Sequence, residues 1–117
     1  MKKILLISGI CTLLITAMSY QIILKTSLQI KILNRLGSTV TGVEVKLYGD
    51  KEDYDSEKNQ IGETQLTDKK GQVLFKDLEA KSYYVSAKKD KLSNYGEAEL
   101  TDTLTAGRRN KVIIIIN

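Results

Sequence analysis

The stretch from Thr67 to Val85 constrains the fold more than any other part of the chain. It contains a polar turn that closes on Gly71, an alternating segment, a short link, and a second segment that opens on Tyr83 and Tyr84. Apolar residues that alternate with polar ones indicate a strand with one buried face. A glycine at the turn supplies backbone torsions that other residues adopt only at a cost. This order is typical of a small all-β sandwich.

The same alternation continues through the rest of the chain after Tyr20, and no helical periodicity competes with it. Seven candidate strands fall within about 90 residues, a spacing that is typical of sandwiches. Their ranges are 28–32, 43–47, 61–66, 72–76, 83–87, 98–100 and 112–116. The last range, 112–116, is apolar on both faces, so we expect both of its faces to be covered by core. If the run were exposed, it would promote aggregation.

The N-terminal segment has the pattern of a secretory signal. Lys2 and Lys3 precede the apolar stretch Ile4–Met18, and Ala17-Met18-Ser19 places small residues where signal peptidase reads the chain. We therefore expect cleavage before Tyr20, which divides the chain into a signal peptide, 1–19, and one domain, 20–117. The domain is then exported, to the periplasm, the cell surface or the medium.

An uncleaved membrane anchor is the alternative for this segment, because the uncharged run Ile4–Leu24 is long enough to cross a bilayer. Polar residues within the run make it only moderately apolar, which favours cleavage. Cys11, the one cysteine of the chain, follows Ile10 rather than the small residue that a lipoprotein signal requires. After cleavage the domain has no cysteine, so its stability must come from a sheet core without disulfides.

Composition excludes several classes of function. The formal charge of +4 falls to +2 once Lys2 and Lys3 are removed, and the remaining lysines are scattered, which argues against a nucleic-acid partner. The chain has no histidine, so it offers no Ser/His/Asp set, and it contains no glycine-rich phosphate loop. We expect no enzyme activity and no cofactor, and contact with a membrane only through an uncleaved N-terminus.

The order of these motifs resembles the carboxypeptidase regulatory-like domain, within the transthyretin-like and Cna B-type group. The resemblance covers nearly all of the chain after the signal and rests on Leu28-x-Ile30-x-Ile32, Gly37, Gly42-Val43-x-Val45-x-Leu47, Thr67-Asp68-x-x-Gly71, Val73-x-Phe75-x-x-Leu78 and Tyr83-x-Val85. It implies a seven-stranded, prealbumin-like (Greek-key) β-sandwich. It also implies an accessory, adhesive or scaffold role outside the cytoplasm. The proline that often follows the Gly37 position in the family is missing here, and Thr39 stands near that place.

The resemblance raises the question of an internal isopeptide bond, which many Cna B-type domains form. Lys31, six residues before Gly37, matches the family's lysine, and Asn117 matches its asparagine. The family's acid would fall four residues after Tyr83, where this chain has Ala87. Alternation also turns Lys31 toward solvent, away from a dry core. The sequence therefore favours a surface lysine and a terminal asparagine over a bond between them.

The resemblance also covers transthyretin-like enzymes that hydrolyse 5-hydroxyisourate. Those enzymes rely on histidines and on a C-terminal Tyr-Arg-Gly-Ser, whereas this chain has no histidine and ends in Ile116-Asn117. The enzyme interpretation is therefore excluded.

The acid-rich stretch 50–57 is a candidate calcium site. Asp53, Asp55 and Glu57 alternate there as oxygen ligands for calcium sometimes do. No glycine lets the chain wrap around an ion, and neighbouring lysines offset part of the charge. We therefore interpret the stretch as a solvated loop.

Tyrosines near two loops are the remaining candidates for binding. Tyr54 lies in the 50–59 loop, and Tyr95 lies beside Asn94 in the 90–96 loop. Tyrosines next to polar residues can contact a glycan or a protein, and sandwiches usually carry function on end loops. We therefore expect a non-enzymatic structural, adhesive or binding module whose partner is a protein or glycan. The alternative is a membrane-anchored accessory subunit of an envelope assembly.

Overall fold

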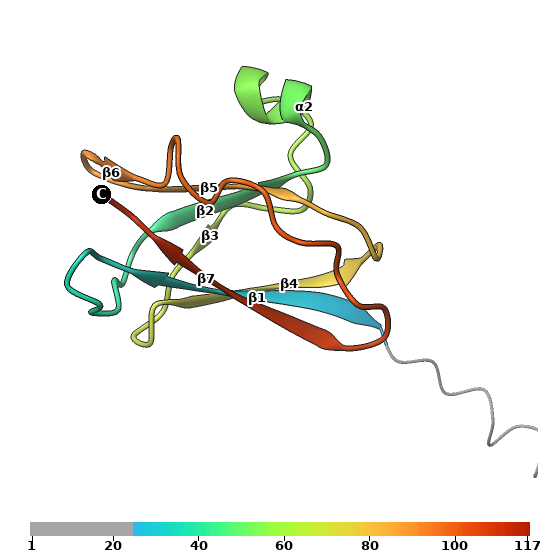
Figure 1. The fold of residues 1–117 in the computed structure, drawn as a ribbon, viewed down its shortest axis with the longest axis horizontal. Coiled ribbons are helices and arrows are strands. Elements are labelled where there is room, and N and C mark those ends of the chain that lie inside the picture. Colours follow the sequence, from blue (N-terminus) through green and yellow to red (C-terminus); the bar gives the residue numbers. More distant parts are fainter. Residues whose placement is uncertain (1–24) are drawn as a thin grey trace, which may run out of the picture.

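The computed structural model describes residues 25–117, which form a two-layer β-sandwich with one short helix on its outside (Figure 1). One sheet has the order β4-β1-β7 and the other the order β3-β2-β5-β6. The strands are β1 (Thr26–Leu33), β2 (Glu44–Tyr48), β3 (Gln65–Leu66), β4 (Gln72–Leu78), β5 (Tyr84–Lys89), β6 (Leu92–Ser93) and β7 (Arg109–Ile115), and the helix is α2 (Lys51–Ser56). The expected all-β, seven-stranded sandwich is confirmed.

The first and last strands lie side by side in the three-stranded sheet. β1 is central, antiparallel to β4 and parallel to β7, so that Ile30 pairs with Val73 on one side and Val112 on the other. In the second sheet β2 is antiparallel to both β3 and β5, with Val45 opposite Ala87. Strands distant in the sequence are thereby joined in each sheet, and the two sheets enclose one core.

Most of the core consists of the residues that alternation assigned to inner faces, and Leu104, Ile114 and Ile116 complete it. Burying each large aliphatic side chain contributes about 1.5–3 kcal/mol, so the shared inner face is the main source of stability for a domain without cysteine. The buried set comprises Leu28, Ile30, Ile32, Val43, Val45, Leu47, Val73, Phe75, Tyr83, Val85, Ala87, Leu104, Ile114 and Ile116. The predicted inner faces of β1, β2, β4 and β5 are therefore correct.

The turn before β4 forms for the reasons that its residues suggested. One carboxylate oxygen of Asp68 accepts hydrogen bonds from the backbone N–H groups of Lys70 (2.9 Å) and Gln72 (3.0 Å). These bonds, first that from Gln72 and then that from Lys70, hold the pKa of Asp68 below its ordinary value. Gly71 has φ of 71°, and a Cβ atom there would lie 2.9 Å from the carbonyl oxygen of Ile32. Only glycine fits this position without a backbone shift.

The predicted strand 98–100 is wrong, and β6 takes its place in the sheet. Leu100 makes only an isolated bridge to Tyr84. The side chain of Asn94 occupies the edge of β5 between β6 and that bridge, accepting from the N–H of Ala87 (3.0 Å) and donating to the carbonyl of Val85 (2.8 Å). A side chain thus replaces backbone pairing over part of this edge, which interrupts the strand.

The predicted covering of 112–116 on both faces is also wrong. β7 lies at the edge of its sheet, and among residues 25–117 no element covers the sheet's outer face (Figure 1). Ile114 and Ile116 enter the core, whereas Ile113 and Ile115 are 63% and 44% exposed. The run is apolar on both faces, but only one face meets the core.

The expectations for the signal segment, the cleavage before Tyr20 and Cys11 lie outside the described residues. Within 25–117, no helix has the length and apolar character needed to span a bilayer.

Candidate functional site

Most of the acid-rich stretch 50–57 forms the helix α2 (Lys51–Ser56), which corrects the expectation of a loop. Asp50 caps its N-terminus: the carboxylate accepts from the N–H of Asp53 at 2.8 Å. Acidic residues in the first turn stabilise the helix, because their negative charges lie near the positive end of the helix dipole. Lys51 pairs with Asp55 one turn later at 3.1 Å, and Glu57 ends the helix with φ of 54°. A six-residue helix is too short to produce a helical period in the sequence.

Tyr54 attaches this helix to the outer face of the four-stranded sheet. Its ring meets that of Tyr48 edge to face at a centroid distance of 5.9 Å and lies 5.5 Å from the ring of Tyr84. Its hydroxyl donates to a carboxylate oxygen of Glu99 at 2.5 Å. Edge-to-face aromatic pairs add about 0.5–1.5 kcal/mol beyond burial, so α2 has a fixed position on the sheet.

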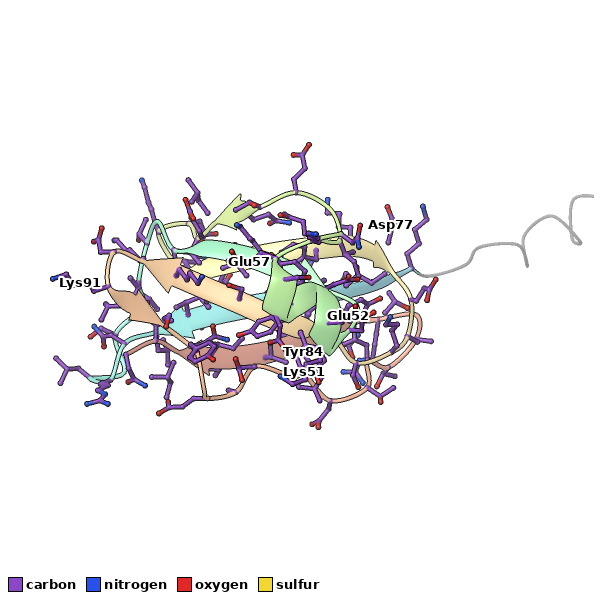
Figure 2. All side chains as sticks on the ribbon, turned by 90° about the horizontal axis from the view of Figure 1, so that it is seen from above. Lys51, Glu52, Glu57, Asp77, Tyr84 and Lys91 are labelled. Atoms are coloured by element: carbon purple, nitrogen blue, oxygen red, sulfur yellow. The ribbon has the colours of Figure 1, made fainter. Side chains whose placement is uncertain are left out.

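A groove of about 450 Å³ opens beside α2 and is called the tyrosine groove below. Figure 2 shows α2 lying across the four-stranded sheet, with Lys51 and Glu57 toward its opposite ends. The groove is lined by Lys51, Tyr54, Asp55, Glu57, Ser86, Lys88 and Tyr95. Tyr95 stands at its rim with 78% of its surface exposed.

The charges in the tyrosine groove are balanced. Lys51 pairs with Asp55, and Lys88 pairs with Glu57 at 3.2 Å. Both pairs are solvent-exposed, so each contributes little to stability and can exchange its partner for a ligand group at little cost. The groove can therefore offer hydrogen-bond donors and acceptors together with aromatic faces.

Burial keeps the hydroxyls of Tyr48 and Tyr54 protonated. Burial, with the hydrogen bond to Glu99 as the second cause, raises the pKa of Tyr54 well above 10. Burial also raises the pKa of Tyr48 above its ordinary value. Both hydroxyls therefore stay neutral near neutral pH, and that of Tyr54 is a hydrogen-bond donor.

The structure brings Tyr54 and Tyr95 into one groove but removes Asn94 from the predicted contact surface. Asn94 is only 2% exposed, and its amide bonds the backbone of β5. Lys88 and Ser86 also line the groove, and sequence reasoning did not select them. The alternation over 83–87, with Tyr83, Val85 and Ala87 inward, was the signal that placed the side chains of Ser86 and Lys88 outward.

The three carboxylates of the calcium candidate point to separate partners. Asp53 accepts from the side chain of Asn59 at 3.0 Å, while Asp55 and Glu57 pair with two lysines. Within 25–117, no group of three or more Asp, Glu, His or Cys side chains could hold a metal ion.

Lys31 and Asn117, the isopeptide candidates, are not brought together. Lys31 lies on the outer face of β1, opposite Ile113 of β7. Asn117 follows Ile113 by four residues, which is about 13 Å along an extended chain. The side chain of Asn117 accepts from Arg35 at 2.6 Å and donates to Glu97 at 2.8 Å. Ala87, at the family's acid position, is buried without a carboxylate.

Solved structures of pilin subunits share this fold. A streptococcal ancillary pilin superposes with a TM-score of 0.57 at 16% identity, covering 80% of this chain and 32% of the pilin. A variant of the major pilin subunit of Bacillus cereus gives a TM-score of 0.53 at 14% identity, covering 79% and 28%. The chain shares the β-sandwich fold of pilin domains. It spans about a third of the length of these pilins, so it corresponds to one part of each.

No protein-family profile matches the sequence, and no curated protein matches it significantly. At these identities the similarity to pilins concerns the fold alone.

Proposed function

We propose that this chain is an exported, non-enzymatic β-sandwich module with a structural or adhesive role at the cell envelope, and that the tyrosine groove is its contact surface. The observation that carries the proposal is the groove itself: two tyrosines from separate segments meet there on a rigid sheet. The fold shared with pilin subunits supports a role outside the cytoplasm.

The chemistry of the groove suits a glycan or a polar protein segment. Tyr95 offers an exposed aromatic face, and exposed aromatics are the residues that most often dominate binding energy. Lys51, Lys88 and their acidic partners supply hydrogen bonds of both polarities beside it. A sugar ring, which has one apolar face and a rim of hydroxyls, needs this combination.

A membrane-anchored accessory subunit is the second candidate, favoured by the uncharged run Ile4–Leu24. Such a subunit would keep its N-terminal segment and sediment with membranes. The first candidate is recovered without that segment. Fractionation of cells followed by immunoblotting separates the two.

The proposal is tested by replacing Tyr95 with alanine. We expect the immobilised protein to bind members of a glycan array or isolated envelope proteins. Tyr95→Ala should lower that affinity at least about tenfold, equivalent to about 1.4 kcal/mol. Its folding should be unaffected because the side chain is already exposed.

The matched control is Leu36→Ala, which removes a side chain that is 89% exposed and does not line the groove. It should bind like the wild type. Equal affinities for wild type, Tyr95→Ala and Tyr54→Ala would show that the groove is not the contact surface.

A further inference from the structure

Among residues 25–117, no strand pairs with the outer edge of β7. The N–H of Ser27 donates to the carbonyl of Arg108 at 3.1 Å, and the N–H of Ile116 donates to the carbonyl of Leu33 at 2.9 Å. The backbone N–H and C=O groups of even-numbered residues in β7 therefore point toward β1, because these groups alternate sides along a strand. The N–H and C=O groups of Arg109, Lys111, Ile113 and Ile115 point away from β1, and no pairing with another strand of residues 25–117 engages them.

The opposite edge of the same sheet is blocked at Leu74 of β4. The side-chain amide of Gln65 donates to the carbonyl of Leu74 at 2.8 Å and accepts from the backbone N–H of Leu74 at 3.2 Å. This pair of hydrogen bonds imitates the pairing of a neighbouring strand with β4. Edges are commonly blocked in such ways because an open edge recruits another strand. Within 25–117, β7 has no equivalent block.

Apolar surface accompanies this free edge. Ile113 and Ile115 are exposed on the outer side of the sheet, and Leu100, 54% exposed, lies on the segment beside it. A shallow groove of about 180 Å³ separates the segment 98–102 from the edge at Val112–Ile114. A strand added to β7 would cover these side chains as well as satisfy the backbone.

We propose that the edge of β7 pairs antiparallel with β7 of a second copy of this chain. The pairing is two-fold symmetric about Val112 and places Arg109 opposite the partner's Ile115 and Lys111 opposite the partner's Ile113. Each free N–H and C=O group of one strand then meets its complement on the other. No two charged side chains face each other directly, and the stems of the basic residues cover the isoleucines.

Charge favours a second copy over an unrelated strand. The basic residues Arg108 and Arg109 lie at the start of β7, whereas its far end lies beside an acid, since Asn117 donates to Glu97 at 2.8 Å. In the two-fold pairing, the basic start of each strand approaches the partner's Glu97. The edge is therefore complementary to itself, and Leu100 of one copy approaches its symmetry mate.

The test is the molar mass of the protein purified with its own N-terminus, measured by sedimentation equilibrium over a range of concentrations. We expect a monomer–dimer equilibrium. In the dimer, amide hydrogens of Lys111, Ile113 and Ile115 should become protected from exchange, whereas those of Val112 and Ile114 are protected in both states. A protein that remains monomeric at about 1 mM overturns the proposal.

Two variants make the interface specific. Ile113→Pro removes an N–H that faces the partner and not β1, a place where a strand tolerates proline; we expect at least a tenfold rise in the dimer dissociation constant with the fold retained by circular dichroism. Leu66→Lys, on the other sheet, is the matched control and should dimerise like the wild type. A dimer unaffected by Ile113→Pro overturns the proposal.

A charge reversal keeps the test valid if the proline variant fails to fold. Arg109→Glu should weaken the dimer at least tenfold, and Glu97→Arg in the same chain should restore it. A double variant no tighter than the single one contradicts the proposed register.

Discussion

Tyr54 is the side chain that connects the helix to both the sheet and the segment after β6. Its ring contacts two tyrosines of the sheet and its hydroxyl reaches Glu99, 45 residues along the chain. Spacing in the sequence could not predict that contact, because nothing local links the two positions. The same limit explains why Asn94 was expected on the surface. In the sequence, an asparagine whose side chain bonds the backbone of β5 looks like any loop asparagine.

The raised pKa of Tyr54 gives a prediction for stability against pH. The folded protein holds this proton more tightly than the unfolded chain, so the stabilisation is complete below pH 10 and is lost as the pH rises above it. Tyr54→Phe should reduce the fall in melting temperature between pH 9 and 11, without abolishing it because Tyr48 and Tyr83 also have raised pKa values. An equally steep fall in Tyr54→Phe would contradict this role.

Asn94 gives a second prediction at the same scale. Asn94→Ala leaves the buried N–H of Ala87 and carbonyl of Val85 without partners, and each orphaned group costs about 1–3 kcal/mol. We expect the free energy of unfolding, measured by urea denaturation, to fall by about 2 kcal/mol or more. Ser38→Ala, an exposed site, is the control and should stay within about 0.5 kcal/mol of the wild type.

At the scale of elements, α2 is the part that a change of one residue should loosen. Asp50→Ala removes the N-cap and should lower the free energy of unfolding by about 1 kcal/mol. Asp50→Asn keeps a capping oxygen and should retain most of that stability. Hydrogen exchange at the amide of Asp53 measures the effect directly. Exchange unchanged in Asp50→Ala would mean that the packing of Tyr54 alone holds the helix.

Strand interiors were predictable from sequence, whereas strand neighbours were not. Alternation gave the buried faces of β1 and β5 correctly because it depends only on residues within one strand. It could not tell that β7 lies at an edge, since the order of strands in a sheet is set by contacts between distant segments. Ile113 and Ile115 were therefore expected in the core and are exposed.

At the scale of the molecule, the sequence was enough to predict the fold but not the lining of the candidate site. The motif order around Thr67–Leu78 and Tyr83–Val85 was sufficient for the sandwich, which pilin structures share. The site required α2 and the loop of Tyr95 to converge on one face; of its lining, Tyr54 and Tyr95 were predicted as contact residues, and Asp55 and Glu57 only as calcium candidates. The places of Lys88 and Ser86 in the groove lining emerge only when α2 is placed over β5.

The measurement that tests the central claim most directly is the intact mass, by fraction, of the protein recovered from cells that make it with its own N-terminus. An exported, unlinked sandwich predicts a chain that starts at Tyr20, lies outside the cytosol, and shows no loss of ammonia. A full-length mass in the soluble cytosol would contradict export. A mass lower by one ammonia would contradict the separation of Lys31 from Asn117.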